Sequence, residues 1–112
     1  MEGQENNVNR TMMGSISKED VLDKLSELMH PEIDNDLVEL GMIGDVKVRY
    51  PVVSLTLMLP FQKIPIKYDL MDMIKESLYD LDGHIDINIK TDTMSEAEKE
   101  NFLKLAREGW KF

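Results

Sequence analysis

The spacing of the hydrophobic residues changes twice in the middle of the chain, and this change sets the order of its helices and strands. Apolar side chains alternate with polar ones over residues 45–50, 53–59 and 85–89. Period two is typical of a β-strand with one buried face, so we expect three strands, the first two joined as a hairpin. Between the second and third strands, residues 65–82 carry apolar side chains at helical spacing. They predict an amphipathic helix.

Two pairs of polar residues mark the starts of further helices. Ser17 with Asp20, and Ser95 with Glu98, have the spacing of a capping box, in which each side chain accepts the other residue's backbone N–H. Apolar residues at helical spacing follow both pairs. We therefore expect a first helix over residues 18–29 and a terminal helix at the end of the chain.

The predicted fold belongs to the α/β class as a two-layer α+β sandwich. Its α-β-β-α-β core has a three-stranded mixed sheet covered by two helices, and a C-terminal helix follows. A β-α-β crossover is right-handed, so the third strand should run parallel to the second. Of the two possible positions, we favour the split arrangement, in which the third strand lies beside the first.

The length and composition indicate one domain with a short tail. Residues 1–15 are rich in Asn, Gln, Glu and Gly and have no apolar period, so we expect them to be disordered. Residues 16–112 should form a single domain that buries roughly two thirds of its unfolded surface. The whole chain has 112 residues, which leaves no room for a second core.

The charge and the missing cysteines exclude several function classes. A net charge of -9 would repel phosphate groups, so neither nucleic acid nor an anionic membrane is an expected partner. No apolar segment has the length of a membrane span or a signal peptide, which indicates a cytoplasmic protein. The chain has no cysteine, and therefore no thiol nucleophile and no thiolate for zinc or an iron–sulfur cluster. We expect no resident cofactor.

The acidic segment after the first helix contains the densest group of possible ligands. His30, Glu32 and Asp34 could be imagined as a metal or acid–base site, although their spacing is that of no known metal motif. We favour a structural interpretation, because acidic residues in loops mostly serve capping and solubility. A protonated His30 at a helix end is favoured by the helix dipole, and Asp34 or Asp36 can cap the following turn.

Backbone requirements explain other residues of the same segment. Pro31 disfavours helical geometry at His30 and is expected to end the first helix, and Gly41 can adopt the positive φ that closes a turn. Farther along, residues 80–84 combine two aspartates, a glycine and a histidine, which is typical of a helix-to-strand turn. The terminal aromatic residues Trp110 and Phe112 are expected to fold back on their own domain.

These residues resemble the first motif of the metal–sulfur (iron–sulfur) cluster assembly family of PaaD-like and SufT-like proteins. Members typically read Asp-Pro-Glu, a short spacer, and then Leu-Gly with further apolar residues. Pro31, Glu32, Leu40 and Gly41 match this pattern, and His30 replaces the aspartate. The resemblance covers about residues 18–90.

The second family motif follows the second strand and is only partly matched. It typically has two threonines, a proline, and then Cys-Pro at the start of the next helix. Here Met58 and Leu59 stand at the threonine positions, Pro60 is present, and Ile64-Pro65 replaces Cys-Pro. The resemblance implies the fold, whereas the thiol that such proteins are thought to use is absent.

Three functions remain open. The resemblance implies a non-enzymatic accessory or adaptor protein of cluster assembly, which contacts assembly factors or client proteins with its His30 and Glu32 loop and with the segment after the second strand. A second hypothesis is a weak metal-binding protein or hydrolase that uses His30, Glu32 and Asp34. A third is a degenerate domain for dimerisation or scaffolding, which would form a homodimer.

Overall fold

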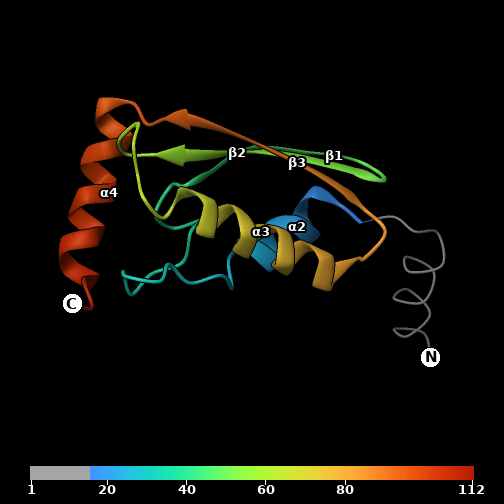
Figure 1. Cartoon of the computed structure of the whole chain (residues 1–112), viewed down its shortest axis with the longest axis horizontal. Coiled ribbons are helices and arrows are strands. Elements are labelled where there is room, and N and C mark those ends of the chain that lie inside the picture. The colour runs from blue at the N-terminus through green and yellow to red at the C-terminus, as the bar shows by residue number, and fades with distance from the viewer. Residues whose placement is uncertain (1–15) are drawn as a thin grey trace.

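The computed structural model describes residues 16–112, whose helices and strands follow the predicted order α-β-β-α-β-α (Figure 1). The predicted α+β class with a three-stranded mixed sheet is confirmed. The tail predicted for residues 1–15 lies outside the described residues. The elements are α2 (Lys18–Leu25), β1 (Ile43–Arg49), β2 (Val52–Leu59), α3 (Lys67–Leu81), β3 (Asp86–Thr93) and α4 (Glu96–Gly109).

Both predicted capping boxes are present. The Ser17 hydroxyl accepts the Asp20 backbone N–H at 3.0 Å, and the Asp20 carboxylate accepts the Ser17 N–H at 2.9 Å. Ser95 and Glu98 make the same two hydrogen bonds at 3.2 and 2.8 Å. By contrast, Ile66 at the start of α3 supplies no side-chain cap. The helix between β2 and β3 therefore depends on the packing of its apolar face rather than on its first turn.

The first helix is shorter than the helix predicted over residues 18–29. Residues 28–30 instead run antiparallel to residues 35–37, and the His30 backbone N–H donates to the Asn35 carbonyl at 3.0 Å. The helix ends where this tertiary pairing begins, several residues before the proline that was expected to end it. The proline prediction was therefore wrong, because backbone hydrogen bonds between residues 28–30 and 35–37 take the place of helical ones before Pro31 is reached.

The order of the strands corrects another prediction. The sheet has the order β1-β2-β3, with β1 antiparallel and β3 parallel to β2, so the split arrangement is wrong. The strand composition explains the observed order. Val53, Leu55 and Leu57 of β2 are at most 2% exposed, and the central position buries this most apolar strand. The edge strands β1 and β3 carry charged residues at alternate positions.

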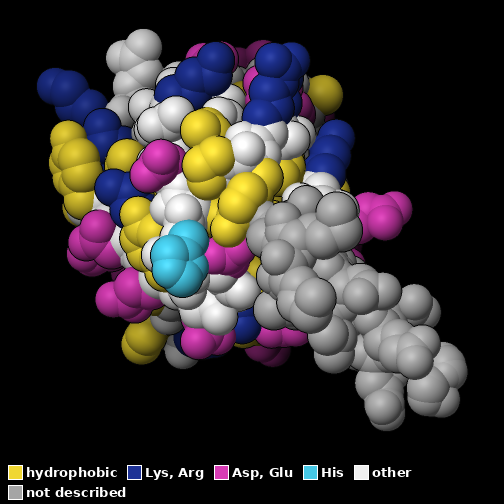
Figure 2. All heavy atoms as spheres, turned by 90° about the vertical axis from the view of Figure 1, so that its right-hand side faces the viewer, with side chains coloured by type: hydrophobic (Ala, Val, Ile, Leu, Met, Phe, Trp, Pro, Cys, Tyr) yellow, Lys and Arg dark blue, Asp and Glu magenta, His cyan; other side chains and the backbone are white. Residues whose placement is uncertain are grey.

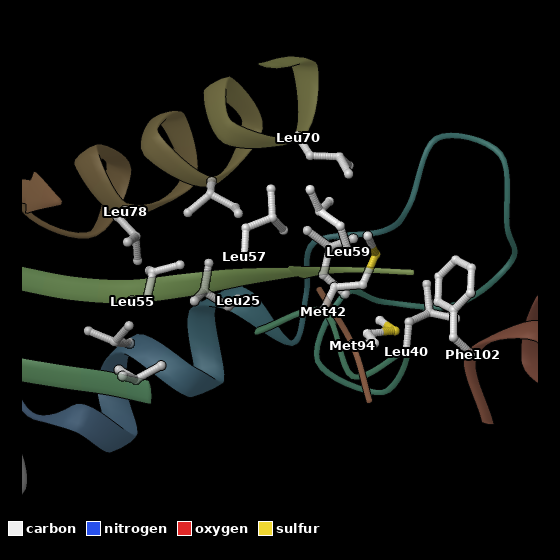
Figure 3. Packing of buried hydrophobic residues seen from close by; sticks show 14 of the residues in the cluster. Leu25, Leu40, Met42, Leu55, Leu57, Leu59, Leu70, Leu78, Met94 and Phe102 are labelled. Atoms are coloured by element: carbon white, nitrogen blue, oxygen red, sulfur yellow. The ribbon is translucent and has the colours of Figure 1, made fainter. Parts of the chain in front are cut away.

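The helices cover the sheet unequally. Within the described residues, α2 and α3 lie on one face, the other face has no helix over it, and α4 stands across the end of the sheet (Figure 1). Figure 3 shows buried side chains from the sheet, α2 and α3 in one cluster, with Leu40, Met94 and Phe102 at the end nearest α4. Phe102 on α4 thus extends the core beyond the sheet.

Candidate functional site

His30 is a buried residue with a defined structural role. Its side chain is only 3% exposed, and its Nδ1 accepts the backbone N–H of Glu32 at 3.0 Å. An Nδ1 that accepts a hydrogen bond carries no proton, so the imidazole is neutral. Burial is the main cause that lowers the pKa of His30, and nearby Lys111 lowers it further, while Glu32 opposes the shift. The protonated histidine at a helix end, which the sequence suggested, is not observed.

The backbone beside His30 is paired with the C-terminal end of the chain. We call residues 109–111 the C-terminal strap. The Asp34 N–H donates to the Gly109 carbonyl at 2.7 Å, and the Lys111 N–H donates to the Glu32 carbonyl at 3.1 Å. A β-bridge joins the residues between them, Ile33 and Trp110. The strap therefore holds the segment that carries Glu32 and Asp34.

The strap leaves little room for a side chain at its first position. A Cβ atom on Gly109 would lie 3.2 Å from both the backbone N and O of Asp34. The side chains of the terminal aromatics were expected to dock on their own domain, and this prediction was wrong, since Trp110 is 53% and Phe112 81% exposed. Only the backbone of Trp110 pairs with the domain, at Ile33. No signal in the local sequence indicated the strap, because it joins segments far apart in the chain.

The turn that follows is capped as one of the structural interpretations predicted. The Asp36 carboxylate accepts the Glu39 N–H at 2.8 Å, and the Asp36 carbonyl accepts the Leu40 N–H at 3.1 Å. Gly41 has the predicted positive φ, at 77°. Leu37 and Leu40 are fully buried, so this turn anchors the loop in the core.

The segment after β2, residues 60–66, is constructed differently. Pro60 is buried, the next three residues are exposed, and Ile64 packs partly buried against the core. Pro65 precedes α3 by two residues, although it was expected to be the first residue of the helix. The segment lines a shallow depression of about 280 Å³ with Lys67 and Tyr68. The Lys99 Nζ of α4 lies 5.4 Å from the centre of the Phe61 ring.

The structure does not combine the candidate ligands into one metal site. Among residues 16–112, no three His, Asp or Glu side chains are grouped so that they could hold a metal ion. His30 already uses its Nδ1 within the loop, and Asp34 is exposed. Within the same range, no hydrogen bond or ion pair links His30, Glu32 or Asp34 to residues 60–66. What the geometry provides is a loop held by backbone hydrogen bonds and an exposed segment that carries Phe61.

The second acidic cluster, residues 80–84, serves the fold. The Asp80 carboxylate lies 2.9 Å from the Lys24 Nζ, and this contact lowers the pKa of Asp80 and raises the pKa of Lys24. Asp82 accepts the His84 backbone N–H at 2.8 Å, as expected of a turn. The pair joins α2 to α3, and the turn leads into β3.

Comparisons with known proteins agree with this architecture. The family model described as "Iron-sulfur cluster assembly protein" matches residues 18–91. A solved structure titled "Crystal Structure of Domain of Unknown Function DUF59 from Bacillus anthracis" has a TM-score of 0.65 and 19% identity, and the similarity covers 80% of this chain and 87% of that one. At 19% identity, this structural similarity supports the fold alone. No curated protein matches the chain. Helix α4 and the strap lie outside the family match.

Proposed function

The chain belongs to the iron–sulfur cluster assembly protein family, and we propose that it acts there as a non-enzymatic accessory protein. Family membership supports a role in cluster assembly. In our proposal the cluster is cargo that other proteins hold, and this chain contributes by contacting assembly factors or client proteins in the cytoplasm. Within the described residues, no helix has the length and apolar character of a membrane span.

The residue at position 64 carries the proposal. The family pattern has a cysteine before the proline here, and this chain has Ile64, whose side chain packs against the core. An isoleucine has no lone pair with which to bind iron, and the sequence has no cysteine elsewhere. The residues present therefore do not fit a cluster held by this chain's own thiolates, and contact with other proteins is the activity that remains.

The surface next to Ile64 is suited to such contact. Phe61 is 50% exposed and Tyr68 is 67% exposed, and Tyr68 lines the depression together with Ile64. Aromatic side chains provide large contact areas at protein interfaces and are frequent energetic hot spots. We call Phe61 and Tyr68 the aromatic pair, and we propose that the partner binds there.

Genetic complementation tests the proposed role. Deleting the gene in the source organism should lower the activity of iron–sulfur enzymes, and the wild-type gene should restore it. A Phe61→Ser/Tyr68→Ser double variant should fail to restore activity. Tyr79→Ser is the matched control, because Tyr79 is 45% exposed on the same helix as Tyr68 but about three turns farther from residues 60–66. Normal iron–sulfur enzyme activity in the deletion strain would contradict the role in assembly.

A biochemical experiment tests the cargo model separately. Anaerobic incubation of the purified full chain with iron and sulfide should leave no protein-bound cluster absorption. The Ile64→Cys variant, treated identically, shows whether a thiol at this position is sufficient for binding. A stable cluster on the wild-type chain alone would overturn the proposal that its ligands come from partners.

A further inference from the structure

Strand β3 has one edge without a partner. All eight of its residues pair with β2 on one side, and within residues 16–112 no strand pairs with the other side. The opposite edge of the sheet is less regular, because β1 has a bulge between Gly44 and Lys47 in which Asp45 has a φ of 50°. A bulge blunts an edge, whereas a regular unpaired strand is a template for another strand.

The hydrogen bonds to β2 show which backbone groups face this edge. The Asp86 N–H donates to the Pro51 carbonyl at 2.7 Å, and the Met94 N–H donates to the Leu59 carbonyl at 2.8 Å. The even-numbered residues of β3 therefore direct their backbone groups towards β2. Successive peptide groups in a strand point to opposite edges, so the N–H and C=O groups of the odd-numbered residues face outward.

The side chains beside this edge leave apolar surface accessible. Ile87 and Ile89 face α3 but are only partly buried. Both line a depression of about 650 Å³ that also includes Met71 of α3 and residues of β1 and β2, so it extends across the sheet from β3. Figure 2, which views the molecule from the right-hand side of Figure 1, shows Lys and Arg side chains at the top of the view and hydrophobic side chains exposed below them. A partner strand beside β3 would cover the accessible parts of Ile87 and Ile89.

We propose that the partner is a second copy of this chain, paired antiparallel to β3 about a two-fold axis at Asn88. Asp86 then lies opposite the partner's Lys90, and Lys90 lies opposite the partner's Asp86. Ile87 lies opposite the partner's Ile89. The backbone N–H and C=O groups of both residues face this edge, so each residue can donate one hydrogen bond to the other and accept one from it. The result is a continuous six-stranded sheet with the helices of both copies on one face.

The charges of β3 select this register over its neighbours. An axis at Lys90 would place Lys90 opposite itself, and an axis at Ile89 would place Asp86 opposite the partner's Asp92. An axis at Ile87 would place Asp86 opposite Asn88 and would lose both ion pairs. An axis at Thr91 would also pair Lys90 with the partner's Asp92, but it would place Ile89 opposite Thr93 and would leave Asp86 outside the strand pairing. The axis at Asn88 is the register that pairs opposite charges and also brings the two isoleucines together, and opposite charges facing each other across strands stabilise pairing.

Charge reversal on the full chain tests the inference independently of the proposed function, because the readout is oligomeric state alone. Wild type should form a dimer whose fraction rises with concentration in sedimentation velocity experiments. Asp86→Lys and Lys90→Asp should each weaken dimerisation by about tenfold or more, because each places like charges opposite one another. An equimolar mixture of the two variants should recover the dimer, because every charge then meets an opposite charge.

Matched controls separate pairing from net charge and folding. Asp23→Lys and Lys104→Asp make the same charge changes at exposed positions on α2 and α4, and both should leave the dimer unchanged. Circular dichroism should be the same for all variants, since both changed β3 residues are exposed. The inference is overturned if the wild-type chain stays monomeric at every concentration. That includes the case in which the β3 edge binds a different protein instead of a second copy. The inference is also overturned if the dimer survives both single reversals or is not recovered in the mixture.

Discussion

The two segments that resemble the family motifs are stabilised in opposite ways. Residues 30–41 are held by backbone pairing to the strap and by the Asp36 cap, and they bury Ile33, Leu37 and Leu40. Residues 60–66 are mostly exposed, and their carbonyls accept backbone hydrogen bonds from the first turns of α3, from Lys67 to Ile64 at 3.1 Å and from Leu70 to Ile66 at 2.9 Å. The loop thus supports the fold, whereas the segment after β2 mainly provides surface. This explains how the fold accommodates an isoleucine at the cysteine position.

The largest expected effect is the loss of a buried side chain from the loop. Leu40→Ala removes a fully buried leucine and should lower the free energy of unfolding by about 2–5 kcal/mol, measured by urea denaturation. Ile64→Ala, in the partly buried segment, should cost clearly less. Equal losses at the two positions would contradict the difference between the segments.

A smaller effect is expected at the glycine that closes the loop. Gly41→Ala should cost about 1–2 kcal/mol, since a side chain disfavours the φ of 77° even though no atom lies within 4 Å of the added Cβ. Gly83→Ala is the control, because its added Cβ meets only an ordinary 3.9 Å contact and its φ is not in the positive range. If Gly41→Ala matches Gly83→Ala in urea denaturation, backbone geometry does not hold the loop.

The pH dependence of stability should depend on His30. The pKa of this buried imidazole is lowered from 6.5 in the folded state, so the unfolded chain binds the proton more readily. Stability is therefore complete above about pH 6.5 and should fall as the pH decreases below that value towards the folded pKa. His30→Asn should flatten the profile between pH 7.5 and 5.5.

His84 provides the control for this measurement. Its side chain is 93% exposed, and His84→Asn should leave the profile of the wild type unchanged. The expectation for His30 would be refuted by a wild-type profile that is flat over this range, or by one that His30→Asn leaves unaltered.

The smallest effect on stability is expected in the segment after β2. Phe61→Ser removes a half-exposed ring and should change the free energy of unfolding by only about 0.5 kcal/mol. The same variant should weaken complementation if the aromatic pair binds a partner. A stability loss comparable to that of Leu40→Ala would show that this segment, too, supports the fold.

Much of the fold was predictable because it depends on local patterns. The capping boxes at Ser17 and Ser95, the alternation in the strands and the positive φ of Gly41 each involve residues close in sequence. The candidate site was less predictable. His30 could be identified as a potential ligand, but its burial depends on the packing of the folded chain, and the spacing alone did not show that its Nδ1 accepts the Glu32 N–H.

The sequence by itself determined the order of the elements, the apolar face of each, and the absence of a thiol at position 64, because periodicity and composition are properties of the chain. Tertiary structure alone decided where α2 ends, which strand is central, and that Gly109 lies against Asp34. The end of α2 depends on the pairing of residues 28–30 with residues 35–37, and the other two features depend on contacts between segments that are far apart in the chain. Local propensities do not determine which segments pair, because the pairing that forms is the one that buries apolar surface more favourably than the alternative pairings.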